Sequence, residues 1–176
     1  SSQKVGPTIA DDIKNAAMGS IVFSLLIIFL YILLRFRKWQ FSLGAVVAVF
    51  HDVLIVLSIF SFFYGILPFS LEIDQAFIAA LLTIIGYSLN DTVVVFDRVR
   101  EYMNINKRKE IKEFMNTSLN STLSRTINTS LTTFFVLLII FIFGGEVIRG
   151  FMFALMVGVI VGTYSSLFVA SPIMLD

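Results

Sequence analysis

The sequence contains no cysteine and has few proline, histidine and charged residues. Its 176 residues include three prolines and one histidine, and 14% are charged, against about 25% in an ordinary soluble domain. The absence of cysteine excludes disulfides, thiolate zinc sites and cysteine nucleophiles. In contrast, 57% of the residues are hydrophobic, 19 are phenylalanine, and the mean hydropathy is +0.92. This composition predicts an integral membrane protein built of helices.

Several classes of functional site are also missing from the sequence. It has no glycine-rich phosphate loop and no nucleophile and base arrangement, and one histidine cannot form a histidine-rich metal site. The net charge is +1, so no basic field favours nucleic acid. We therefore expect that the chain is not an enzyme, binds no cofactor or metal ion, and has no nucleic-acid partner.

Five apolar stretches are long enough to cross a membrane, which takes about 20 residues in a helix. The predicted spans cover about 16–34, 41–67, 75–96, 120–143 and 150–173. We therefore predict an all-α, polytopic bundle of five transmembrane helices that forms a single transmembrane domain over residues 1–176.

The positions of the basic residues predict the orientation of this bundle. Nine of the 13 lysines and arginines lie in two connections, 35–38 and 97–115. The connections after the second and fourth spans contain a single arginine, Arg149, and no lysine. Because short cytoplasmic loops are enriched in lysine and arginine, the first and third connections are expected in the cytoplasm. The N-terminus is then extracytoplasmic and the C-terminus cytoplasmic.

The cytoplasmic loop 97–115 leads into a predicted amphipathic helix. Ile111, Phe114, Met115 and Leu119 share one helical face, while the basic residues of this region lie elsewhere. Such a helix is typical of a segment that lies on the membrane surface and contacts anionic lipid. We expect a short amphipathic cytoplasmic helix before the fourth span.

Four ionisable residues lie within the predicted spans. They are His51, Asp52, Asp91 and Arg125. From the extracytoplasmic ends, a rise of about 1.5 Å per residue places Asp52 at about 20 Å, Asp91 at about 26 Å and Arg125 at about 29 Å. These depths fall in one layer of the cytoplasmic half, so Asp91 and Arg125 can pair if their helices are neighbours. Charged groups at this depth are costly and usually functional.

Polar residues accompany these charges on the third and fourth spans. Tyr87 and Asn90 lie near Asp91, and Thr122, Asn128 and Thr129 lie near Arg125. We predict that they line a hydrated crevice between the two helices.

Two interpretations of the buried charges remain open. Asp91 and Arg125 could form a fixed buried ion pair that only sets helix packing, with nearby hydroxyls bonded to their own helix. Alternatively, the carboxylate binds and releases a proton opposite the arginine, which would be a proton relay. For His51 and Asp52, local pairing is the simpler interpretation, and their part in ion transfer stays open.

The fifth span carries small residues at every fourth position. Ala154, Gly158, Gly162, Ser166 and Ala170 form this ladder. A face of small side chains lets another helix approach closely, so we expect these residues in a helix contact.

Several sequence motifs resemble those of one known family. The run GYSLNDTVVVFDRVRE occupies residues 86–101. Other motifs in register are Val5-Gly6-Pro7, Tyr31, Arg35-Phe36, His51-Asp52-Val53, Ser124-Arg125-Thr126, Gly144-Gly145 and GTYSS at 162–166. Over essentially its whole length the chain resembles the C-terminal membrane region of the SecF family, part of the SecDF protein-export factor in the RND superfamily.

This resemblance implies a role in protein export through the bacterial inner membrane. It implies the last five of six membrane helices of an RND-type half, paired with a SecD half that is fused or separate. The ion, a proton or sodium, would pass by Asp91 and Arg125, which match the family's intramembrane charged residues. The SecYEG translocon and the translocating preprotein would be partners. The alternative is a fragment of an RND-type small-molecule exporter, which would need large extracytoplasmic domains.

Overall fold

The computed structural model describes residues 7–105 and 111–175, and the side chains of 19–105 and 114–175. Its elements are α1 (Pro7–Phe36), α2 (Trp39–Phe63), α3 (Gln75–Ile105), α4 (Ile111–Phe143), α5 (Glu146–Ser165), the π-helix η1 (Ser166–Ala170) and α6 (Ser171–Leu175). Five helical stretches are long and apolar enough to cross a membrane, the last of them running from Glu146 to Leu175. The predicted all-α bundle of five membrane helices is confirmed.

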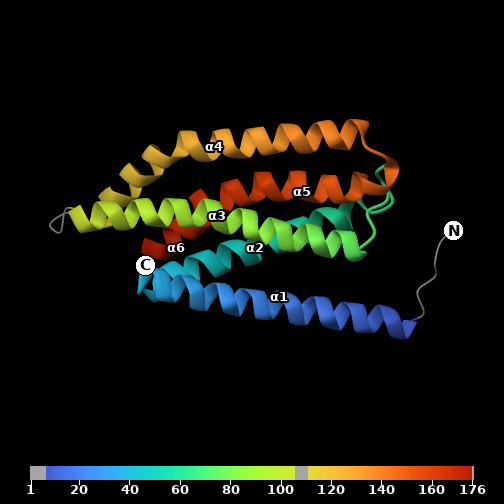
Figure 1. Cartoon of the computed structure of the whole chain (residues 1–176), viewed down its shortest axis with the longest axis horizontal. Coiled ribbons are helices and arrows are strands. Elements are labelled where there is room, and N and C mark those ends of the chain that lie inside the picture. The colour runs from blue at the N-terminus through green and yellow to red at the C-terminus, as the bar shows by residue number, and fades with distance from the viewer. Residues whose placement is uncertain (1–6, 106–110, 176) are drawn as a thin grey trace.

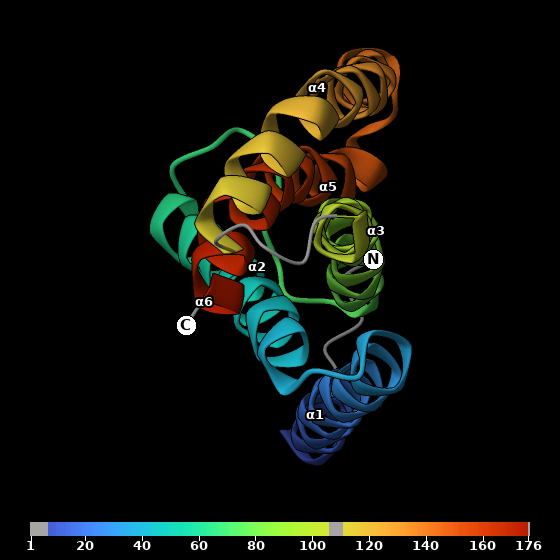
Figure 2. The ribbon, with the colours of Figure 1, turned by 90° about the vertical axis from the view of Figure 1, so that its left-hand side faces the viewer.

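The chain reverses direction at each connection, so that the five long helices form an elongated bundle (Figure 1). α2, α3 and α5 contact one another, α1 packs mainly on α2, and α4 packs on α5 and α3 (Figure 2). In the apolar stretches of α1 and α4, 11% of the residues are buried, against 44% in α2, in α3 and in the stretch from α5 to α6. The centre of the bundle is therefore α2, α3 and α5, with α1 and α4 outside it.

Phenylalanines fill both ends of the bundle core. At one end, the rings of Phe36 and Phe41 stack at 5.0 Å, and Phe96 meets Phe41 edge-on at the same distance. At the other end, Phe60 and Phe77 lie 4.4 Å apart. Because membrane helices gain little from hydrophobic burial against lipid, close ring packing of this kind supplies much of their contact energy.

The helices on either side of the third connection are longer than the sequence predicts. The predicted loop 97–115 is largely helical, since α3 continues to Ile105 and α4 begins at Ile111. Past the apolar part of α3, Arg98 and Glu101 form an ion pair of 2.6 Å one turn apart, which stabilises a helix outside the membrane. The basic residues at 107–109 lie outside the described residues.

The predicted short amphipathic helix is instead the first part of α4. No proline or glycine interrupts residues 111–143, so nothing separates it from the fourth span. Its apolar face packs against protein, because Phe114 and Met115 are buried and Met115 joins the core cluster of Phe36 and Phe96. The expectation that this face rests on lipid is therefore wrong for these two side chains.

The last membrane segment contains a π-helical turn that is not expected from the sequence pattern. It spans Ser166–Ala170, just before Pro172. In an α-helix the ring of Pro172 would clash with the carbonyl of Phe168, and a wider turn relieves this contact. The hydroxyl of Ser171 donates to the carbonyl of Ser166 at 3.1 Å and so satisfies an acceptor inside the turn. Such turns are frequent at functional sites.

Candidate functional site

Asp91 lies in α3 with its side chain turned into the bundle. It is 4% exposed, and its Oδ2 atom is buried without a hydrogen-bond partner among the described residues. The charge of this carboxylate interacts with Arg125 and with the hydroxyl of Ser130, both on α4. Because an unpaired buried carboxylate oxygen is costly, proteins retain such groups chiefly where they have a function.

Arg125 lies on an exposed face of α4. In the part of the chain that the structure describes, no ion pair joins Arg125 to Asp91. The fixed buried ion pair considered from the sequence is therefore absent, although the two charges still interact across the space between α3 and α4. Arg125 is exposed on α4, which lies outside the central three helices, whereas Asp91 is buried.

Of the other predicted lining residues, some are buried in the bundle and others are exposed on its surface. Tyr87 is half-buried and Thr122 is buried, whereas Asn90, Asn128 and Thr129 are exposed. The hydroxyl of Thr122 donates to the carbonyl of Ser118 at 2.9 Å, and that of Thr129 donates to the carbonyl of Arg125 at 2.9 Å. Both hydroxyls are thus satisfied by their own helix, as is common for threonine in membrane helices.

The buried polar face of α4 contains one of the lining residues predicted on this helix. Its members are Ser118, Thr122, Thr126 and Ser130, at strict four-residue spacing. Thr122 is that residue, whereas the predicted lining residues Asn128 and Thr129 are exposed. The four-residue spacing was the available signal, but hydroxyl residues lie all around this helix and no single face stood out.

Hydroxyl groups of three helices meet beside Asp91. Ser130 of α4 and Thr163 of α5 lie 2.5 Å apart, and the Tyr87 hydroxyl of α3 donates to Ser130 and to Thr133 at 3.5 Å. Ser130 and Thr163 also border a groove of about 270 Å³ between α4 and α5. The Ser130 hydroxyl also interacts with the Asp91 carboxylate, so this chain of hydroxyls extends from the carboxylate towards that groove.

A second buried carboxylate, Asp52, lies where α2, α3 and α5 meet. It is 1% exposed, and its Oδ2 atom accepts hydrogen bonds from Ser88 at 2.5 Å and from Ser165 at 2.7 Å. Its Oδ1 atom lies 3.1 Å from Nδ1 of His51. The sequence predicts no role for Ser88, Ser165, Ser130 or Thr163, because nothing in one chain shows which hydroxyl on a distant helix faces a given carboxylate.

The small residues of α5 and η1 lie in helix contacts. Ala154, Ser166 and Ala170 are fully buried, and Gly158 and Gly162 face α3. A Cβ atom on Gly162 would lie 3.1 Å from that of Ser88, so the glycine lets this serine approach. Gly162 thus lies beside the contact between Ser88 and Asp52. Among the described residues, no group of three His, Asp or Glu side chains could hold a metal ion.

Comparison with known sequences gives the family of this chain. Residues 1–176 match the family described as protein export membrane protein SecD/SecF, C-terminal. The chain belongs to this SecD/SecF family. Its relatives include the protein translocase subunit SecF of Rhodothermus marinus, 66% identical over 98% of this chain and 56% of the relative. SecF of Vibrio alginolyticus is 46% identical over 97% of the chain and 52% of the relative.

A SecDF relative and a SecDF structure support the same assignment. The protein translocase subunit SecDF of Brucella abortus is 44% identical over 98% of this chain and 22% of the relative. A crystal structure of SecDF in a super-membrane-facing form matches with a TM-score of 0.80 and 40% identity, covering 97% of this chain and 22% of that one. The chain spans about half the length of the SecF relatives named here. It is a multi-pass membrane protein of a family of transport components.

Proposed function

We propose that this chain is the membrane-embedded, non-enzymatic part of a SecF-type subunit that couples ion flow to protein export. The observation that carries the proposal is the Asp91 carboxylate, buried within a membrane helix with one oxygen free of hydrogen bonds among the described residues. Intramembrane carboxylates of this kind mark ion and proton pathways. Asp91 is the group that binds the proton or sodium ion, and Arg125 is the mobile counter-charge.

The exposed polar face beside Asp91 is the surface that a SecD half would cover. Asn90, Arg125, Asn128 and Thr129 are exposed at the level of the membrane, where polar groups facing lipid are unfavourable. The relative named SecDF, whose name joins SecD and SecF, supports pairing of this kind. We place the SecYEG translocon and the preprotein as further partners, and the bacterial inner membrane as the location, with the N-terminus extracytoplasmic and the C-terminus cytoplasmic.

Ion flux through the reconstituted full-length complex tests this function. With Arg125→Ala we expect proton or sodium flux to fall about tenfold, which corresponds to about 1.4 kcal/mol in the barrier, because Asp91 loses the charge that displaces its ion. Arg125→Lys should keep part of the flux, since it retains a cation. Flux is measured in lipid vesicles with a proton gradient or a sodium gradient alone, which also identifies the ion.

Arg149→Ala provides the matched control, because Arg149 lies in the first turn of α5, whereas Thr163, which meets Ser130 beside Asp91, lies in its last turn. We expect this variant to conduct as the native protein does. Unchanged flux in Arg125→Ala would show that the ion does not depend on this arginine and would contradict the proposal.

A further inference from the structure

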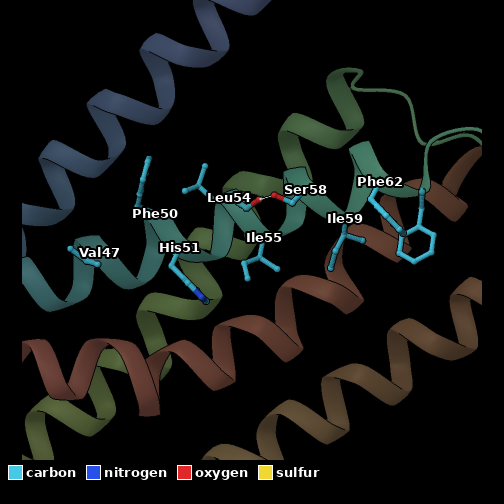
Figure 3. A pocket seen from close by; sticks show the side chains of 9 residues that line it. Val47, Phe50, His51, Leu54, Ile55, Ser58, Ile59 and Phe62 are labelled. Carbon is cyan, nitrogen blue, oxygen red and sulfur yellow. Dashed lines mark hydrogen bonds between the residues drawn. The ribbon is translucent and has the colours of Figure 1, made fainter.

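Two adjacent ionisable residues of α2 face different surroundings. The Asp52 carboxylate is buried against α3 and α5, while the His51 side chain is 31% exposed. His51 also lines a groove of about 710 Å³ along the outer face of α2, in which Ser58 is the other polar residue (Figure 3). The Ser58 hydroxyl is already bonded to the carbonyl of Leu54. The imidazole therefore connects this groove to the buried carboxylate.

Both oxygens of the Asp52 carboxylate are engaged. Oδ2 accepts from Ser88 and Ser165, and Oδ1 meets only the imidazole of His51 among the described residues. His51 makes no second hydrogen bond there, so its other ring nitrogen is without a protein partner in the described part of the chain. A proton can therefore reach the carboxylate through His51 without breaking either serine contact.

Among the described residues, the helices around Asp52 supply hydroxyls and no permanent cation. α3 presents Ser88, and α5 presents Ser165 and Tyr164, whose ring lies 6.4 Å from that of His51. η1 has no titratable side chain, and α1 packs towards this region through apolar residues such as Ile28. Tyr87 and Asp91 also lie on α3, but they interact with side chains of α4. The Tyr87 hydroxyl donates to Ser130 and Thr133, and the Asp91 carboxylate interacts with Arg125 and Ser130. A buried carboxylate normally requires a partner of opposite charge, and here that partner is a histidine whose charge depends on pH.

We propose that Asp52 is a second proton-binding site, reached through His51 and distinct from Asp91. An imidazolium at His51 breaks its Nδ1–H bond and passes the proton to Oδ1 of Asp52, where an O–H bond forms. A charged pair becomes a neutral pair, in which Nε2 of His51 keeps its hydrogen and Nδ1 accepts a hydrogen bond from the new O–H group of Asp52. The site rests on the proposed function for its role in transport, but its protonation chemistry stands independently.

Protonation of Asp52 is transmitted to the helices through its two serines. A neutral carboxyl group is a weaker acceptor than a carboxylate, so the bonds from Ser88 and Ser165 weaken together. Ser165 directly precedes the π-helix, and the carbonyl of Ala170 at the end of that turn lies 2.7 Å from where a Cβ on Gly44 of α2 would be. Through Ser165, the charge of Asp52 thus affects η1, the segment that packs against α2 at Gly44.

Infrared difference spectroscopy tests the site in the full-length subunit with its SecD-type partner in lipid vesicles. Spectra at acid and alkaline pH report the C=O stretching band of each protonated carboxyl group. We expect one such band to vanish in Asp52→Asn and to remain in Asp91→Asn. It should change frequency in Ser165→Ala, which removes a donor, and stay unchanged in the matched control Ser58→Ala. In His51→Phe its titration midpoint should move by about one pH unit or more.

Amide deuterium uptake of residues 163–171 gives a second readout. After correction for the intrinsic pH dependence of exchange, we expect uptake to rise on acidification in the native protein and to be independent of pH in Asp52→Asn. The proposal is overturned if Asp52→Asn keeps every pH-dependent carboxyl band of the native protein. If that variant does not fold, an unchanged band in both Ser165→Ala and His51→Phe overturns it equally. None of these results depends on ion flux, so the proposed role of Asp91 is judged separately.

Discussion

Asp91→Asn in the full-length subunit is expected to reduce ion-dependent stimulation of export to the level without an ion gradient. Asparagine has nearly the size and shape of aspartate, but its amide neither binds a proton in this pH range nor carries a negative charge for a sodium ion. The native Oδ2 has no hydrogen-bond partner among the described residues, so the substitution breaks no bond to that atom. Loss of activity would therefore reflect the lost charge.

The measurement is preprotein translocation into inverted membrane vesicles, with and without an imposed gradient. Co-purification with the SecD-type partner should stay at the native level, because the change removes a charge and not volume. Glu101→Gln is the matched control, since Glu101 is a carboxylate of the same helix that is exposed and paired with Arg98. Full gradient-dependent stimulation in Asp91→Asn would remove Asp91 from the mechanism.

Gly158→Ala is expected to destabilise the bundle, although alanine is the better helix former. A Cβ atom on Gly158 would overlap the side chain of Ile84 on α3, which is itself 1% exposed and has little room to move. Overpacking of this kind costs about 1–3 kcal/mol. Thermal unfolding of the full-length protein in detergent should therefore begin at a lower temperature than in the native protein.

A second substitution distinguishes overlap from other causes. Ile84→Ala removes the three atoms of Ile84 that a Cβ on Gly158 would meet, so the double variant should be more stable than the sum of the two single changes predicts. Gly86→Ala is the control, because a Cβ there meets nothing within 4 Å and the helix gains from alanine. Additive effects in the double variant would refute the predicted contact between α3 and α5.

Much of the candidate site followed from local features of the sequence. Asp52 and Asp91 were identified because each interrupts an apolar run, and Arg125 because it is a charge within the fourth predicted span. Both features are visible without any knowledge of neighbours. The partners of Asp52 could not be found in this way. Ser88 and Ser165 lie 36 and 113 residues away along the chain, and many other serines were equally possible.

The buried face of α4 could not be identified from the sequence for a related reason. One residue corresponds to about 100° of rotation, and the region from Ser118 to Thr133 carries polar residues on every side. Periodicity therefore could not distinguish the face of Ser130, which is buried, from the face of Thr129, which is exposed. The contact of α4 with α5, where Ser130 meets Thr163, made that choice.

The sequence by itself determined the class of protein, the number of membrane helices and the ionisable residues within them. These depend on length, hydropathy and charge, which are properties of consecutive residues. Only the tertiary structure decided that Asp91 and Arg125 do not form an ion pair and that Asp52 accepts hydrogen bonds from serines of two other helices. It also decided that a π-helix follows Ser165. Each of these depends on how helices rotate and pack against one another, and no local pattern specifies that.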